Sequence, residues 1–146
     1  MKSLKVTKLI NLVYLFESHH MQFQQQLFYL FGSLFGMLSI AAGAFGSHLL
    51  KSRLTSEYLG VFEVAVRYQM YHALTLILIA FLMKSSQSSW LPKAGWTFII
   101  GVFLFSGSLY TLVLTNVKRW GIITPIGGAA LLIGWFFLML FGFFDK

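Results

Sequence analysis

Twenty consecutive residues without a charged side chain, Pro125 to Phe144, lie near the end of the sequence. A bilayer core about 30 Å thick needs about 20 apolar residues in a helix, so this segment can cross a membrane. Three more apolar segments precede it, at residues 27–49, 62–83 and 94–115. Charged residues make up 10% of the chain, against about 25% in a soluble domain. The sequence therefore predicts an all-α integral membrane protein, a four-helix transmembrane bundle with short loops, whose last helix covers residues 125–144.

The chain divides into an N-terminal extension, residues 1–25, and a transmembrane domain, residues 26–146. Lysines precede a short apolar run in the extension, and the apolar residues of that run share one helical face. No small-residue cleavage site follows it, so a secretory signal is not favoured. Three interpretations stay open: an interfacial amphipathic helix, a targeting segment, or residues upstream of a start at Met21. The first and third are favoured.

The basic residues sit in short clusters between the apolar segments. The formal net charge of +7 comes from 11 Lys and Arg residues against 4 Asp and Glu. This placement indicates contacts with anionic lipid headgroups of the bilayer, and no nucleic-acid partner. The chain has no cysteine, which excludes disulfides, thiolate metal sites and cysteine nucleophiles.

Small residues form a stripe along the first spanning segment. They recur at spacings of four, three, four and three residues, at Gly32, Gly36, Ser39, Gly43 and Gly46. Such stripes let helix backbones approach closely in lipid, so the pattern favours helix packing. The alternative is a groove kept open for a ligand.

The second spanning segment carries polar side chains where lipid should lie. Its run free of strongly polar residues, 73–83, has eleven residues and is too short for a bilayer. Counting the required length back from Met83 places Arg67, Gln69 and His72 at or below the headgroups. Ionisable groups at that depth are costly, so they mark a candidate functional site. The candidate polar cluster comprises His48, Glu63, Arg67, Gln69 and His72.

Helical geometry separates the members of this cluster. Glu63 and Arg67 are four residues apart on one face and can pair. His72 lies about 13 Å deeper than Glu63, points nearly the opposite way, and shares its face with Tyr68. The pair is either structural or a substrate or proton site. His72 is either a packing histidine or a contact for a proton, a quinone or a headgroup, and His48 is favoured as a helix-end residue. Ligand spacing supports neither haem nor a metal, so we expect no cofactor.

A second candidate site precedes the last helix. Thr124 suits an N-cap and Pro125 the first helical position. The free N–H groups and positive dipole end of such a helix attract anions. The sequence thus offers an anion or headgroup contact as a candidate, while a capped helix start with glycine packing is the favoured interpretation. The residues concerned are Lys118, Arg119, Thr124, Gly127 and Gly128.

Four motifs carry a family resemblance across residues 28–144. They are GAFGSH at 43–48, FEVAVRYQMYHAL at 62–74, LFSGSLY at 104–110 and ITPIGG at 123–128. In this order they resemble the YgdD/YwdK-like family of small four-helix membrane proteins of unknown function. Ser47 and Val64 stand where the family pattern has Ala and Thr, and Asn116 stands where Gly is usual. The resemblance implies an integral protein of the inner (cytoplasmic) membrane and brings no activity, substrate or cofactor.

Three hypotheses for function follow. The first is a non-enzymatic accessory or assembly subunit of a membrane complex, which small size, short loops and glycine stripes favour. The second is a homo-oligomeric channel, carrier or lipid/quinone-binding protein using Glu63, Arg67 and His72. The third, an enzyme, is disfavoured because no metal motif, nucleophile elbow or phosphate loop is present. We expect partners among other membrane subunits or copies of the chain, and cytoplasmic termini from a small lysine excess.

Overall fold

Four long helices make up almost all of the computed structural model, which describes residues 2–145, with the side chains of residues 19–46 and 48–145. The elements are α1 (Lys2–Phe45), the π-helix η1 (Gly46–Leu50), α2 (Ser56–Leu82), α3 (Trp90–Thr115), the 3₁₀-helix η2 (Lys118–Ile122) and α4 (Thr124–Phe144). Four stretches of the described residues are long and apolar enough to cross a membrane: His19–Leu50, Ser56–Leu82, Trp90–Thr115 and Lys118–Phe144. The predicted four-helix transmembrane fold is therefore confirmed.

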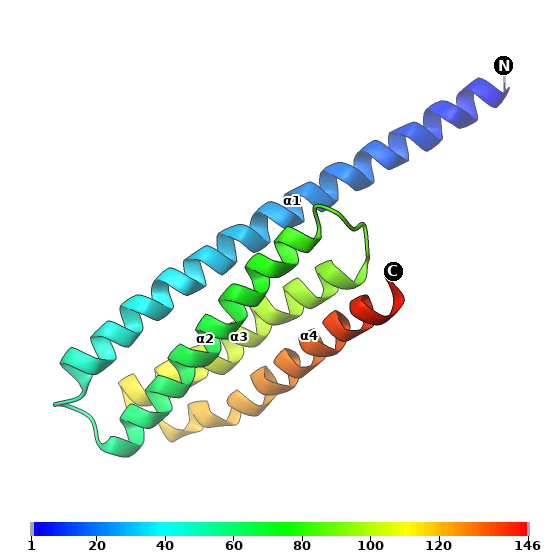
Figure 1. Ribbon diagram of the computed structural model, residues 1–146. Coiled ribbons are helices and arrows are strands. Elements are labelled where there is room, and N and C mark those ends of the chain that lie inside the picture. The colour runs from blue at the N-terminus through cyan, green and yellow to red at the C-terminus, as the bar shows by residue number, and fades with distance from the viewer. Residues whose placement is uncertain (1, 146) are drawn as a thin grey trace.

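The helices form an open layer rather than a closed ring. Successive helices run antiparallel and pack on one another, α1 also contacts α3, and among the described residues α4 packs on α3 alone of the other three helices (Figure 1). Within residues 2–145, no Cα atom of α4 lies within 8 Å of a Cα atom in α1 or α2. The two central helices are consequently the most buried, while α4 buries only Gly127, Leu131 and Gly134.

Two boundaries differ from those expected. α2 begins at Ser56 instead of near Phe62, because the side chain of Thr55 caps it by accepting from the backbone nitrogen of Tyr58 at 3.3 Å. Tyr58 packs in this first turn against the small cluster around Phe62 and Val113. α1 continues in one line beyond the other helices toward the N-terminus (Figure 1). How the extension sits against a membrane stays a prediction.

The small-residue stripe of α1 faces α2. A Cβ atom at Gly32 would lie 2.8 Å from the side chain of Ile77 and 2.9 Å from the carbonyl oxygen of Ala73. A Cβ at Gly46 would lie 3.0 Å from the ring of Phe62. These approaches are too close for a larger residue, so the interpretation of the stripe as a packing surface is confirmed.

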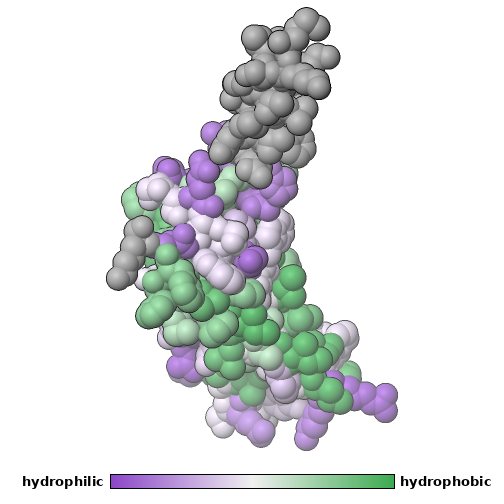
Figure 2. Space-filling model, turned by 90° about the vertical axis from the view of Figure 1, so that its right-hand side faces the viewer, coloured by the Kyte–Doolittle hydropathy of each residue, from purple (hydrophilic) through white to green (hydrophobic). Residues whose placement is uncertain are grey.

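Large apolar side chains cover the outside of the helices. Leu132 and Phe143 of α4 are each 72% exposed. Figure 2 shows a hydrophobic band across the middle of the molecule, with hydrophilic residues toward its ends. Apolar side chains exposed in such a band are solvated favourably by the acyl chains of a bilayer.

Candidate functional site

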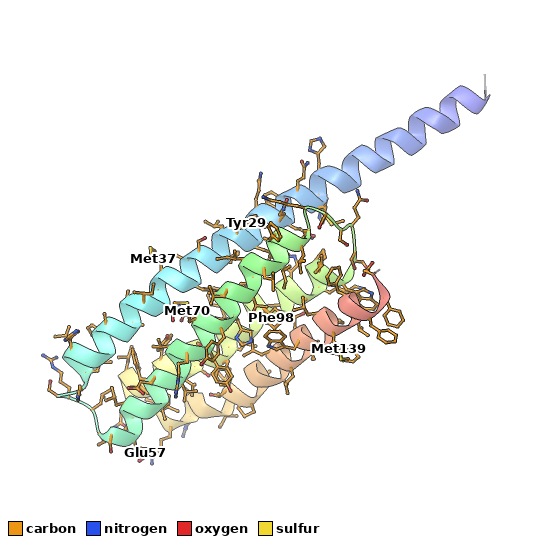
Figure 3. All side chains as sticks on the ribbon, viewed as in Figure 1. Tyr29, Met37, Glu57, Met70, Phe98 and Met139 are labelled. Atoms are coloured by element: carbon orange, nitrogen blue, oxygen red, sulfur yellow. The ribbon has the colours of Figure 1, made fainter. Side chains whose placement is uncertain are left out.

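His72 is buried where α2, α3 and α4 meet. Its exposed fraction is 4%, and its ring lies 5.1 Å from the ring of Phe98, which Figure 3 labels between α2 and α4. Nδ1 lies 2.7 Å from the carbonyl oxygen of Tyr68, and the indole nitrogen of Trp135 donates to Nε2 at 3.2 Å. A carbonyl can only accept and an indole N–H can only donate. The contacts therefore fit a neutral imidazole with its proton on Nδ1.

Gln69 and Thr75, the other buried polar residues near His72 on α2, also bind helix backbone. The amide nitrogen of Gln69 donates to the carbonyl oxygen of Phe35 in α1 at 2.8 Å. The hydroxyl of Thr75 donates to the carbonyl oxygen of Tyr71 at 2.8 Å. The Gln69 bond joins α2 to α1 and so helps hold these helices together in lipid, whereas the Thr75 bond stays within α2.

Two serines near the middle of the layer add bonds that sequence reasoning missed. Ser39 of α1 donates to the carbonyl oxygen of Val66 at 2.7 Å, and Ser106 of α3 donates to that of Ala65 at 2.9 Å. Adjacent carbonyls of α2 are thus bound from both neighbouring helices. The available signal was the presence of serines within apolar segments, but spacing does not identify the carbonyl that each would reach.

Glu63 and Arg67 face outward from α2. Both side chains are exposed, and no ion pair joins them among the described residues. They flank Ala65, which binds Ser106, and Ser108 in turn bonds with Thr124 at 2.8 Å. Glu63 therefore lies level with the start of α4, and Arg67 lies about 6 Å deeper at 1.5 Å per residue. That depth lets an arginine side chain reach the headgroups.

The five residues of the predicted polar cluster do not come together. His48 is exposed in η1 at the membrane surface, Gln69 faces α1, and His72 faces α3 and α4. Glu63 and Arg67 point away from all three. As expected from helical geometry, His72 and Tyr68 share a face, with ring centroids 6.2 Å apart.

At the two glycines near the start of α4, the neighbouring helix α3 lies against the space where a side chain would extend. A Cβ at Gly127 would lie 2.7 Å from the Cα atom of Phe105, whereas a Cβ at Gly128 would lie an ordinary 3.8 Å from the Phe105 ring. Thr124 begins the helix rather than capping it, and its hydroxyl bonds with Ser108. Pro125 lies in the first turn, one position later than the predicted first helical position. Gly127 thus serves helix packing, which was the favoured interpretation.

Lys118 and Arg119 lie in η2 and are exposed. They share the end of the molecule that also holds the α1–α2 connection and Glu57, which Figure 3 labels. This arrangement leaves both cations available to headgroups at that membrane surface.

Trp135 is a site residue that the sequence analysis did not single out. It lies near the middle of α4, and its ring is 5.4 Å from the ring of Phe98. An indole N–H in the apolar interior needs an acceptor, and this need was the signal available.

Comparisons with known proteins give the chain's relatives. The model of a family described as "Protein of unknown function (DUF423)" matches residues 42–128. A UPF0382 membrane protein of Staphylococcus haemolyticus (strain JCSC1435) is 45% identical over 115 residues, covering 79% of this chain and 93% of the relative. The UPF0382 membrane protein YwdK of Bacillus subtilis (strain 168) is 40% identical over 116 residues, covering 79% and 94%. No solved structure matches the chain.

Proposed function

Because the chain belongs to the DUF423 family of membrane proteins, whose description assigns no activity, we propose that it is a non-enzymatic accessory or assembly subunit of a larger complex in the cytoplasmic membrane. The observation that carries the proposal is the outward position of Glu63 and Arg67 on α2 without an ion pair. These two residues belong to a row of exposed side chains that recur every three or four positions, called here the outer face of α2. It comprises Glu63, Arg67, Tyr71, Leu74, Leu78 and Phe81.

Charge on this face is unfavourable next to lipid. An arginine costs about 2.5–3.5 kcal/mol at the bilayer centre and less near the headgroups. Polar groups on a neighbouring transmembrane helix would offset that cost. One acid and one base, a helical turn apart, also provide specificity, because a partner must present the opposite order of charges.

The open layer supports the same proposal. α1 and α4 lie at opposite ends of the layer and do not pack on each other within the described part of the chain. Such an arrangement leaves outward helix faces uncovered for further subunits, and small transmembrane domains commonly associate laterally by this means.

The alternative, a channel or carrier, has less support. The buried polar side chains of α2 are bound to neighbouring backbone or to Trp135. Glu63 and Arg67 face outward, so a path that used them would have to run between chains rather than through one.

Native mass spectrometry of the untagged protein, released from its own membrane in mild detergent, tests the proposal. We expect other polypeptides bound to the wild type and fewer bound to Glu63→Gln or Arg67→Gln. Glu57→Gln is the matched control, since Glu57 is an exposed acid in the first turn of α2, outside the outer face. Masses confined to the 16.6 kDa chain or its multiples would contradict the accessory-subunit role.

A further inference from the structure

A groove opens between α1 and α3 on the side of the layer away from His72. The two helices converge toward the end that holds the termini, where the ring of Phe28 lies 5.6 Å from that of Trp96 and Phe35 lies 5.3 Å from Phe103. Toward the other end they separate. The space between them measures about 660 Å³, within the range of about 300–1,000 Å³ typical of ligand pockets.

The groove holds a buried polar atom that lacks a partner. The hydroxyl oxygen of Tyr110 is buried and makes no hydrogen bond. Such a group is costly when it stays unpaired, and because the Tyr110 side chain lines the groove, a small rotation of its ring would bring the hydroxyl to a ligand that supplies the partner. Gln69, 6% exposed, lines the same groove, and its nitrogen is already bound to Phe35.

The depth of Tyr110 identifies the kind of partner. Its ring lies 5.1 Å from that of Phe62, the residue before Glu63, which is level with the start of α4. The hydroxyl is therefore near the boundary between the hydrocarbon core and the headgroups. In a phospholipid, the ester and glycerol oxygens lie at this depth and the acyl chains extend inward.

Gly107 forms an open part of the groove wall. A Cβ atom built there would meet no atom within 4 Å, unlike the packed glycines Gly101 and Gly127. An acyl chain has the slender shape that this space requires, and its burial would be favourable next to phenylalanine and leucine side chains.

The end of the groove nearest the α1–α2 and α3–α4 connections adjoins a basic surface of the molecule. Phe45 and Leu114 line it and lie in the last turns of α1 and α3. Four exposed cations lie in the connections that follow these helices, against the acids Glu57 and Glu63. The cations are Lys51, Arg53, Lys118 and Arg119.

We infer that this groove binds one anionic phospholipid, with an acyl chain between α1 and α3, a lipid oxygen bonded to the Tyr110 hydroxyl, and the phosphate facing Lys118 and Arg119. A quinone would fill the apolar space but would leave the cations unused, so the charge at the mouth favours the phospholipid. The inference is independent of the accessory role proposed above, because the outer face of α2 lies on a different side of that helix.

Lipid titration followed by native mass spectrometry tests this inference. Delipidated protein is titrated with dioleoyl phosphatidylglycerol and, separately, with dioleoyl phosphatidylcholine. We expect one phosphatidylglycerol to bind preferentially, Tyr110→Phe to weaken it about fivefold, and Gly107→Leu to abolish it. The matched controls are Tyr29→Phe, a tyrosine of α1 that lies outside the groove and outside the outer face of α2, and Gly142→Leu, where a Cβ also meets nothing within 4 Å.

Each other outcome overturns part or all of the inference. Equal binding of the two lipids, unchanged in Gly107→Leu, would mean ordinary boundary lipid. An excess mass of a neutral quinone, retained from the native membrane and lost in Gly107→Leu, would assign the groove to that class instead. An unchanged preference in the double variant Lys118→Gln/Arg119→Gln would remove the headgroup contact from the proposal.

Discussion

The indole nitrogen of Trp135 donates a hydrogen bond to Nε2 of His72 over 3.2 Å, and so links α4 to α2 although the backbones of these helices do not pack on each other. Phe98 of α3 lies against both rings. Because the opposite nitrogen of His72 is bound to Tyr68, the ring orientation is defined from two sides. The bond therefore selects one rotation of α4 on α3, in a region otherwise held by non-directional apolar contacts.

Replacing the donor tests the importance of this bond. Trp135→Phe keeps an aromatic ring but leaves Nε2 of His72 without a partner, and we expect it to lower the free energy of unfolding by about 1 kcal/mol, within the range known for interhelical bonds in membranes. Unfolding in mixed micelles by added denaturing detergent measures the change. Trp120→Phe is the control and should have no effect, because Trp120 is about as exposed as Trp135 (40% against 47%) but its indole donates no hydrogen bond to a described residue. If both variants unfold alike, the hydrogen bond contributes nothing to stability.

The two glycines at the start of α4 should respond very differently to alanine. Gly127→Ala places a methyl group against the backbone of Phe105, where no side chain can move aside, so α4 must separate from α3. We expect a loss of about 1–3 kcal/mol in the free energy of unfolding. Gly128→Ala meets only an ordinary contact at 3.8 Å and should be neutral. If the Gly127→Ala variant is as stable as the wild type but no longer binds anionic lipid, Gly127 has a role in ligand binding rather than in helix packing.

Asn116 ends α3 in the left-handed conformation, with φ at 56°. Asparagine and glycine are the residues that tolerate this geometry best. Its side-chain oxygen also accepts from the hydroxyl of Tyr58 at 2.7 Å. We expect Asn116→Val to cost about 1–3 kcal/mol in unfolding free energy.

Asn116→Gly separates the two contributions at this position. Glycine keeps the backbone conformation and removes only the bond to Tyr58, so unfolding measured under the same conditions should show a much smaller loss than for valine. Equal losses in the two variants would attribute the whole effect to the side-chain bond.

Much of the fold was predictable because a bilayer imposes simple requirements. Apolar length alone located four spanning helices, and the spacing of small residues identified the face of α1 that packs on α2. Helical geometry also placed His72 beside Tyr68 and away from Glu63. The family resemblance is confirmed by the match to residues 42–128 and by relatives that include YwdK.

The contacts between helices were not predictable in the same way. Periodicity gives the direction of a side chain about its own helix axis, and it does not identify the neighbour in that direction. The acceptor for the Trp135 indole is His72 on α2, a helix that is not next to α4 along the chain. The Tyr110 hydroxyl has no hydrogen-bond partner among the described residues. The open layer was missed for the same reason, because a packing stripe on each helix is compatible with a closed or an open arrangement. The roles proposed for Glu63, Arg67 and Lys118 stay predictions.

Replacing Glu63 or Arg67 tests whether the two residues form a structural ion pair or belong to a surface that contacts a partner. Their spacing permits an ion pair, but the side chains stay apart and exposed. Exposed charges of this kind contribute little to stability, so Glu63→Gln, Arg67→Gln and the swapped pair should each unfold within about 0.5 kcal/mol of the wild type. Breaking a buried pair would cost about 3–5 kcal/mol.

Gln69→Ala serves as the positive control, since it removes a buried side chain and its bond to Phe35, and we expect a loss of about 2 kcal/mol. A loss above that of Gln69→Ala in either charge variant would show that the pair forms within one chain, and the outer face of α2 would then no longer be free for a partner.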